Sequence, residues 1–424
     1  MASLYENSQV LSLQLRDARR RTRALTRDLD GPQLFGPKLA IVNPVLWELG
    51  HVAWFQERWC LRLRADESLS ESLLERSDTL YDSAKVAHAT RWDLPLPDLR
   101  KTLDFQDRVL DRVLARLERE PENSWFLYFV QLAIFHEDMH AEAFHYTRQT
   151  LAYPDPLGSG AQGAGAEPPG GDVDVAGGVY LVGASRNSGF HFDNEKWAHP
   201  AQVGPFRIAR TPVTNREFLG FVREGGYRRR EWWSPEGWAW KGEAQAPRYW
   251  TEKENDWFER RFADWVPLEP DLPVMHVNWH EANAYCRYAG RRLPSETEWE
   301  IAASLAGEGG RRRYPWGSST DGARANLSGA GRVPVGRFAS GDSLGGCRQM
   351  IGNVWEWTSS AFGPYPGFVC DPYREYSEPW FGTHKVLRGG SFSTPVRLIA
   401  NSWRNFYTPD RGDVFAGFRT CDLT

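Results

Sequence analysis

Apolar residues recur at helical spacing through the first 150 residues of the chain. In residues 11–29 and again in residues 99–117, leucine, valine and alanine return about once per helical turn among charged residues, which is typical of a helix with one buried face. Residues 45–63 and 125–151 are more uniformly apolar, as in a helix that is largely buried. With a longer connection at residues 65–96, this order predicts a four-helix bundle, a fold whose core often holds metal sites.

The starts of three of these helices carry local signals. Asn43–Pro44 predicts an N-cap followed by a proline in the first helical position. Pro97–Asp98 opens the next helix, and Asn123 or Ser124 caps the last one. Short polar side chains favour these positions because they accept hydrogen bonds from backbone N–H groups that the first helical turn leaves unpaired.

The pattern changes beyond residue 153. Residues 154–171 are rich in glycine, proline and alanine and show no periodicity, so they predict a linker. We therefore expect a bundle at 1–153 and a second domain at 172–424, in which short strand candidates alternate with turns. The overall class is α+β.

Two helices stand out in the second domain, at 280–288 and 295–305. Ser295 and Glu298 have the spacing of a capping box at the start of the latter. Most of the 20 tryptophans lie in this domain or around residue 51, which is typical of a loop-rich fold held together by aromatic packing.

Charge and cysteine content narrow the partners and the compartment. The 51 basic and 55 acidic residues give a net charge of −4, so we expect no nucleic-acid partner. No run of 18 apolar residues occurs, so we expect no membrane partner either. The 5 cysteines are scattered and form no CxxC pair, which favours a reducing, cytoplasmic location.

Two histidines on the fourth predicted helix form a candidate metal site. His136 and His140 are four residues apart, so they share one helical face. Glu137 completes an HExxH pattern, which in zinc proteases supplies a general base. The extended protease pattern fails after His140, and Glu142 is too close to serve as a third ligand. Core histidines without a metal remain an alternative.

A third histidine strengthens the metal interpretation. His51 lies midway along the second predicted helix in an otherwise apolar stretch. Gly50 precedes it, and we expect this glycine to allow close backbone approach between helices. Three imidazoles facing one ion would leave coordination positions open. Imidazole suits iron, copper and zinc, so the ligands alone do not choose the metal.

At this point the residues resemble a known family. Residues 42–62 and 125–151 resemble the DinB-like bundle of the ergothioneine-type sulfoxide synthases. The second half resembles the formylglycine-generating-enzyme (sulfatase-modifying factor) fold, a C-type-lectin-like domain. The matching stretches are PVTN at 212–215, RLPSETEWE at 292–300, YPWG at 314–317, GNVWEW at 352–357, LRGGSF at 387–392 and GFR at 417–419.

The resemblance implies an enzyme that uses iron(II) and dioxygen. In the family, a sulfur donor is joined to the imidazole carbon of hercynine, the trimethylated form of histidine. His51, His136 and His140 match its iron ligands. Formylglycine-generating activity itself is not expected, because residues 391–405 contain no cysteine at the copper-binding positions.

The resemblance also implies substrate contacts in the second domain. Asn405 matches an asparagine that holds the carboxylate end of hercynine, and Phe406 falls where an aromatic ring faces the trimethylammonium group. Tyr407 follows them. Tyr365 is the candidate for the family's tyrosine acid, with two nearby tyrosines at 373 and 376 as rivals.

Several positions depart from the commonest pattern. Met139 stands where a glutamine contacts the imidazole substrate, and residues 81–92 replace an arginine-rich stretch that serves γ-glutamylcysteine. These departures resemble the selenoneine synthase branch, which joins a selenosugar to hercynine. Arg91, Arg404 and Arg411 could still hold a carboxylate, so a thiol donor (cysteine or γ-glutamylcysteine) remains the alternative.

Two other classes of protein fit parts of the pattern. An HExxH zinc hydrolase would need Glu137 as its base. A non-catalytic binding module would use the lectin-like half and carry no stoichiometric metal.

Overall fold

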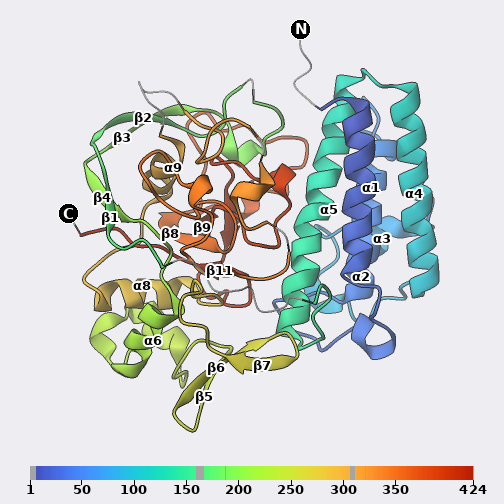
Figure 1. Cartoon of the computed structure of the whole chain (residues 1–424). Helices are drawn as coiled ribbons and strands as arrows, with labels where there is room; N and C mark the ends of the chain where they lie inside the picture. The colour runs from blue at the N-terminus through green and yellow to red at the C-terminus, as the bar shows by residue number, and fades with distance from the viewer. Residues whose placement is uncertain are drawn as a thin grey trace. The chain divides into compact units, whose positions relative to one another are not determined.

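The computed structural model describes residues 6–158, 167–186, 188–305, 311–319, 321–327 and 329–423. The chain divides into two compact units, Met1–Leu157 with Asn187–Phe190, and Gly158–Arg186 with His191–Thr424. Helices make up the first unit, and the second combines short strands, helices and loops (Figure 1). The predicted α+β class, with a helical bundle followed by a lectin-like domain, is confirmed.

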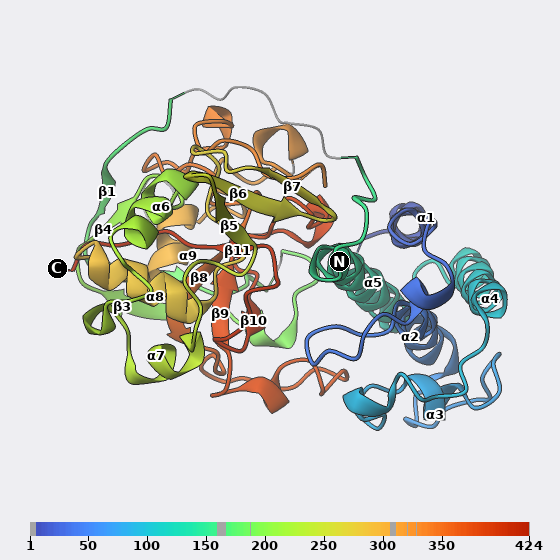
Figure 2. The ribbon, with the colours of Figure 1, turned by 90° about the horizontal axis from the view of Figure 1, so that it is seen from below.

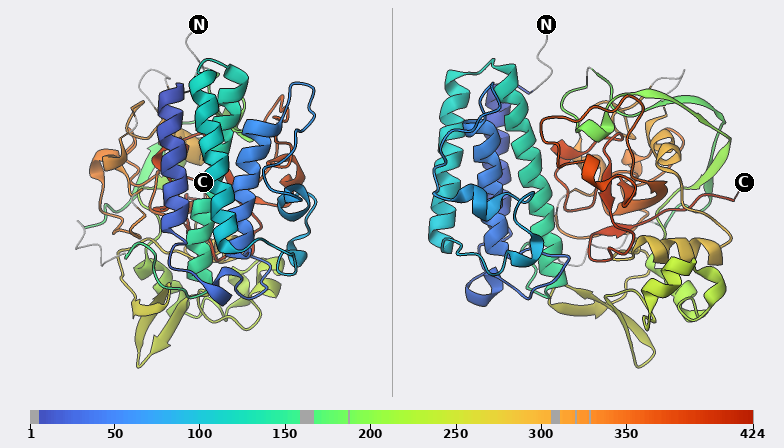
Figure 3. Two further views of the ribbon diagram at one scale, coloured as in Figure 1. Left: turned by 90° about the vertical axis from the view of Figure 1, so that its right-hand side faces the viewer. Right: turned by 180° about the vertical axis from the view of Figure 1, so that it is seen from behind.

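The first unit is built on long helices that run side by side (Figure 3). The helices are α1 (Ser8–Ala24), α2 (Val45–Glu57), the short α3 (Ser77–Tyr81), α4 (Leu99–Arg119) and α5 (Ser124–Thr150). Helix α2 packs on α4 and α5, and α1 packs on α5. Every residue of α2 is buried, which explains why its sequence lacks a polar face.

The predicted caps are correct at α5 and wrong at α2. Asn123 accepts a hydrogen bond from the Phe126 N–H at the start of α5. At α2 the N-cap position is held by Pro44, and no side chain caps the helix. Asn43 instead accepts a hydrogen bond from Arg91, so a tertiary partner replaces the local one. Helix α2 also ends at Glu57, where a π-helical turn (Arg58–Arg62) continues the chain.

Gly50 serves a different purpose from the one that its sequence position suggested. A Cβ atom at Gly50 would lie 2.2 Å from the ring of Tyr81. The glycine therefore makes room for an aromatic side chain from α3, and the expected close approach of a neighbouring helix backbone is wrong.

In the described part of the second unit, the strands form four small sheets. The largest has the order β10-β9-β8-β11 (Figure 2). Its strands are β8 (Trp355–Ala361), β9 (Lys385–Arg388), β10 (Asn405–Tyr407) and β11 (Ala416–Gly417). The others pair β1 (Asp172–Val175) with β4 (Phe206–Ala209), β2 (Gly178–Val182) with β3 (His199–Val203), and β5 (Trp250–Lys253) with β6 (Asp256–Arg261) and β7 (Asp264–Pro267).

The α-helices among the described residues of the second unit are α6 (Asn215–Arg223), α7 (Pro235–Lys241), α8 (Trp279–Tyr288) and α9 (Glu296–Ser304). The predicted capping box of α9 is present, with Ser295 and Glu298 bonded to each other's backbone N–H. Helix α6 begins with the same device, formed by Thr214 and Glu217. Thr214 lies in the PVTN stretch and Glu217 two residues beyond it, so the sequence carries a signal for this helix start as well.

The stretches that resemble the lectin-like family form a buried scaffold. Residues 295–300 supply three glutamates that pair with arginines elsewhere in the unit. The pairs are Glu296–Arg404, Glu298–Arg292 and Glu300–Arg388. Trp299, between them, donates to Glu356, which pairs with Arg419. These stretches therefore maintain the fold.

All five cysteines are free thiols, and four of them are buried. Within the described ranges, no helix combines the length and the apolar character needed to cross a membrane.

Candidate metal centre

Three imidazoles meet in the core of the first unit, as predicted from the spacing of the histidines. His51 comes from α2, and His136 and His140 come from successive turns of α5. Their candidate ligand atoms all lie within 4.8 Å of one another. His51 and His136 are only 2% and 3% exposed, whereas His140 is partly exposed. Helix α5 thus contributes two of the three candidate ligands, and α2 contributes the third.

Hydrogen bonds fix two of the rings. The Nδ1 atom of His51 lies 2.8 Å from the carbonyl oxygen of Tyr81, and Nδ1 of His140 lies 2.5 Å from Oε1 of Glu48. Both acceptors require the imidazole to carry its proton on Nδ1, which leaves Nε2 as the ligand atom. Histidine ligands of metals are commonly oriented in this way. The three residues therefore fit a metal ion.

Aromatic rings enclose the site. Trp47 stacks on His51 with ring centroids 4.9 Å apart, and Phe55 stacks on His136 at 3.5 Å. Burial lowers the pKa of His51 and of His136 well below the usual value, and the proximity of His140 adds to both shifts. These two imidazoles are therefore neutral at physiological pH, which is the state that binds metal.

Glu137 does not face the histidines. Its carboxylate accepts two hydrogen bonds from Arg19 of α1, at 2.7 and 3.2 Å. Arg19 also donates to Gln56 and to the carbonyl of Gln106. Because both oxygens of Glu137 are held in this buried network, the HExxH pattern does not provide the general base that a zinc hydrolase requires.

Two predicted substrate contacts lie in the first unit. Arg91 is buried, with its guanidinium 3.9 Å from the ring of Trp47 and 2.6 Å from Oδ1 of Asn43. Burial lowers its pKa to about 10. Met139 is partly exposed, one residue before the ligand His140 on α5.

The other predicted contacts lie on or near β10 in the second unit. Phe406 stacks on Phe362 at 4.0 Å, with Tyr376 and His384 each at 5.8 Å. The Asn405 side chain accepts a hydrogen bond from the Phe406 N–H.

The Tyr407 ring faces the guanidinium of Arg411 at 4.9 Å, and Arg411 forms a bidentate pair with Asp413. Tyr407 and Arg411 thus lie together, next to the aromatic residues around Phe406.

Tyr365 lies beside one of the buried ion pairs. Its hydroxyl donates to Glu296 at 3.3 Å, and Arg404 faces its ring at 4.1 Å. Burial, followed by the negative charge of Glu296, raises the pKa of Tyr365. Of its rivals, Tyr376 stacks on Phe192 and Tyr373 lies 6.0 Å from Tyr376.

Three contributors to the site were missed from the sequence. They are Glu48, Trp47 and the backbone carbonyl of Tyr81. Glu48 had a signal: it is a carboxylate inside an apolar helix, three residues before His51 and therefore on the same face. A backbone carbonyl leaves no comparable trace in a sequence.

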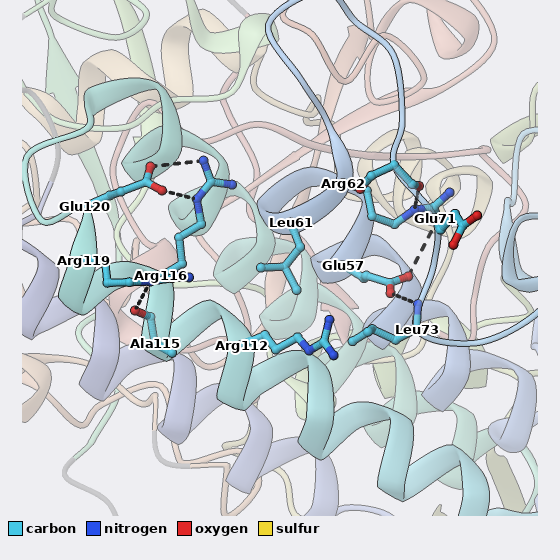
Figure 4. Close-up of a pocket in the computed structure, with 11 residues that line it drawn as sticks. Glu57, Leu61, Arg62, Glu71, Leu73, Arg112, Ala115, Arg116, Arg119 and Glu120 are labelled. Atoms are coloured by element: carbon cyan, nitrogen blue, oxygen red, sulfur yellow. Dashed lines mark hydrogen bonds and ion pairs between the residues drawn. The ribbon is translucent and has the colours of Figure 1, made fainter.

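A cavity of about 590 Å³ lies elsewhere in the first unit, lined by the ends of α2 and α4 (Figure 4). Several of its charges already have partners. Arg116 pairs with Glu120, and Glu57 accepts from the Leu73 N–H. None of the three histidines lines it.

Comparison with known proteins agrees with this two-part architecture. Residues 14–144 match the model of the DinB superfamily, and residues 161–422 match that of the sulfatase-modifying factor enzyme 1-like domain. A hercynine oxygenase of Mycolicibacterium thermoresistibile is 39% identical over 96% of this chain and 94% of its own. The chain belongs to the hercynine oxygenase family.

A second member of the hercynine oxygenase family, from Mycolicibacterium smegmatis, is 37% identical over 97% of this chain and 98% of its own. The formylglycine-generating enzyme of Streptomyces coelicolor is 33% identical over 65% of this chain and 98% of its own. The hercynine oxygenases therefore span both units, whereas the formylglycine-generating enzyme spans a smaller part of this chain.

Proposed function

We propose that this protein is an iron(II)- and dioxygen-dependent enzyme that forms a carbon–chalcogen bond on the imidazole ring of hercynine. His51, His136 and His140 would hold the iron. The observation that carries the proposal is the pair of hydrogen bonds to Nδ1 of His51 and His140, because it leaves Nε2 of each ring available. Iron bound by three imidazoles would supply dioxygen activation, since such a ligand set leaves coordination positions open.

Residues of the second unit would bind hercynine. A trimethylammonium group has no N–H to donate, so an aromatic face is the natural partner for it. Phe406, with Phe362 and Tyr376 around it, offers such a surface. The amide of Asn405 would hold the carboxylate. Tyr407 and Arg411 would border the same place.

Tyr365 would act as an acid. Its hydroxyl is protonated at neutral pH, and because the raised pKa makes it a weak acid, it would donate only to a strongly basic partner. Glu296 accepts its hydrogen bond and orients it.

For the donor, we propose a selenosugar. A dianionic γ-glutamylcysteine would need free cations, but the two basic residues within 81–92 already have partners. Lys85 pairs with Asp82, and Arg91 donates to Asn43. Arg411 pairs with Asp413. A neutral sugar needs no such charge. Cysteine or γ-glutamylcysteine is the second candidate donor, because Arg91 lies 3.9 Å over Trp47, the ring that stacks on His51, and would serve a carboxylate by giving up its hydrogen bond to Asn43.

A comparison of the candidate donors, each in its own reaction, tests this proposal. The protein is incubated without oxygen with iron(II) and hercynine, and dioxygen is then added with a selenosugar, cysteine or γ-glutamylcysteine in separate reactions. In the reaction, the C–H bond of the imidazole is replaced by a carbon–chalcogen bond, and dioxygen is the oxidant. Mass spectrometry should find the hercynine adduct with the selenosugar. An adduct found only with a thiol would overturn the selenosugar and keep the reaction class.

A metal analysis separates the proposed enzyme from the other two classes of protein. His51→Ala should lose stoichiometric iron and all product formation. A zinc-restored, oxygen-independent hydrolase activity would identify a zinc enzyme instead. Wild-type protein that binds no metal would point to a binding module.

A further inference from the structure

Glu48 is an unusual residue for the centre of a helical bundle. It is only 1% exposed on a helix whose other residues are all buried too. A buried carboxylate is costly unless it is paired or hydrogen-bonded. Within the described ranges, no lysine or arginine forms an ion pair with it, and its ionisable hydrogen-bond partner is His140. The position of Glu48 therefore has its explanation in the histidine site.

The placement of Glu48 links the two ligand-bearing helices. Glu48 and His51 are three residues apart and share one face of α2. From that face, Glu48 reaches across to Nδ1 of His140 on α5 at 2.5 Å. Helix α2 thus provides one candidate ligand and also holds the ring of another.

A second layer holds Glu48 itself. Its Oε2 atom lies 3.5 Å from Nδ2 of Asn43, and Oδ1 of Asn43 accepts a hydrogen bond from Arg91 at 2.6 Å. Asn43 therefore bridges a buried carboxylate and a buried guanidinium. The two charges attract each other through this amide without forming a direct ion pair.

The same arginine also supports the other histidine. Arg91 lies 3.9 Å over Trp47, and Trp47 stacks on His51. The carbonyl of Tyr81, at the beginning of the same segment, accepts the hydrogen bond from His51. The segment 81–92 therefore contacts His51 directly, through the carbonyl of Tyr81. It is linked to His140 through Asn43 and Glu48.

We infer that Glu48 is a positioning residue for His140, and that residues 81–92 brace both histidines, Tyr81 by its carbonyl and Arg91 through Asn43 and Glu48. This inference rests on the proposed metal centre, and it concerns ligand geometry before any substrate binds. A carboxylate on Nδ1 fixes the tautomer and makes Nε2 a better electron donor. Residues 81–92, which replace the arginine-rich stretch of other family members, would thus also influence how tightly the site binds metal.

The test measures metal binding without turnover. Iron(II) affinity is determined by competition with a chromophoric chelator, and cobalt(II) is added separately as a spectroscopic probe of coordination. Glu48→Ala should weaken iron binding about 10- to 100-fold, the range seen when partners of histidine ligands are removed. Glu48→Gln, which keeps an acceptor, should lose less. Asn43→Ala and Arg91→Met should each shift the cobalt(II) absorption bands and weaken binding by a smaller factor.

Glu57→Gln is the matched control. Glu57 is a second buried glutamate on α2, but it accepts hydrogen bonds from Ser72 and Leu73 and touches no histidine. This variant should keep wild-type affinity and the wild-type cobalt(II) spectrum. If Glu48→Ala unfolds, Glu48→Gln and Asn43→Ala still provide the comparison, with circular dichroism reporting their folded state.

The outcomes separate this inference from the proposed function. Wild-type iron affinity and an unchanged cobalt(II) spectrum in folded Glu48→Ala or Glu48→Gln would overturn the positioning role. Full affinity in Asn43→Ala and Arg91→Met would overturn the brace. Loss of metal binding in Glu48→Ala, together with no product from any donor in the iron-loaded wild-type protein, would support the inference and refute the proposed reaction. Wild-type metal binding in His51→Ala would refute the metal centre itself.

Discussion

Buried polar groups are arranged differently in the two units. Around His51 in the first unit, they are imidazoles whose Nδ1 atoms donate to a carbonyl and to a carboxylate. Around β8 and β9 in the second unit, they are arginine–glutamate pairs such as Arg419–Glu356, in which the arginine also donates to backbone carbonyls. In the Arg419–Glu356 pair, both carboxylate oxygens and every guanidinium nitrogen have a partner within the unit. His51 and His140 instead donate from Nδ1 and leave Nε2 as the candidate ligand atom, which is the difference between a scaffold and a candidate site.

Removal of one member of a scaffold pair should have the largest effect on stability. In Glu356→Ala, the guanidinium of Arg419 stays buried without its carboxylate, and Trp299 loses its acceptor. We expect the free energy of unfolding to fall by about 3–5 kcal/mol. Urea denaturation measures this change. Arg216→Ala, which breaks an exposed pair with Asp271, is the control and should change the free energy by less than about 1 kcal/mol.

Glu137→Gln tests whether the HExxH glutamate belongs to the scaffold type. The variant keeps the hydrogen-bonding shape but removes the charge that faces Arg19. We expect a loss of about 1.5–3 kcal/mol in stability and unchanged iron affinity, measured by denaturation and by chelator competition. If Glu137→Gln abolished a hydrolase activity and left the free energy of unfolding unchanged, Glu137 would belong to the site instead.

Gly50→Ala tests the link between packing and the site. The added methyl group would overlap the ring of Tyr81, whose carbonyl anchors His51. Overpacking of this kind costs about 1–3 kcal/mol. Iron affinity should fall as well, because the acceptor of His51 moves with the ring. Gly220→Ala, at a helix position where the nearest atom would be 3.8 Å away, should leave iron affinity unchanged and raise the free energy of unfolding by about 0.4–1 kcal/mol.

The pH dependence of stability should show the cost of one carboxyl group in the second unit. Burial raises the pKa of Glu281 to about 7, above its ordinary value of 4.5. Between these values the folded state holds a proton that the unfolded state has lost. This contribution is therefore complete below pH 4.5 and is lost as the pH rises through 7, by at most about 1.4 kcal/mol per pH unit.

Glu281→Gln should remove that slope, because an amide does not titrate. Urea denaturation of both proteins at several pH values between 4.5 and 8 measures the difference. Equal slopes in the wild type and the variant would show that Glu281 titrates normally in the folded chain.

The sequence was sufficient to predict the bundle and the meeting of three histidines. Periodicity placed His136 and His140 on one face of α5, and an apolar context placed His51 inside the core. The sequence did not predict the groups that accept hydrogen bonds from these histidines. The acceptor of His51 is a backbone carbonyl, and the partner of Asn43 is an arginine 48 positions away. Such contacts depend on how helices and loops pack, which no local pattern records.

In the second unit, the sequence predicted the fold but gave little physical evidence for the substrate site. The stretches that identified its family, such as residues 295–300, proved to be partners of buried arginines. They were informative about the fold because the two charged residues of a buried ion pair stand out in an apolar stretch of sequence. The predicted substrate residues near β10 carry no such signature. Their roles still rest on resemblance.

The pair between Arg19 and Glu137 has a mechanical consequence for the histidines. Successive residues of an α-helix point about 100° apart around its axis. His136 and His140 project within about 40° of each other around α5, and Glu137 projects about 80° away from the direction midway between them. Its pair with Arg19 therefore holds α5 against α1 on the face next to the one that carries the histidines, so a contact that neither imidazole makes helps to seat the helix that carries both.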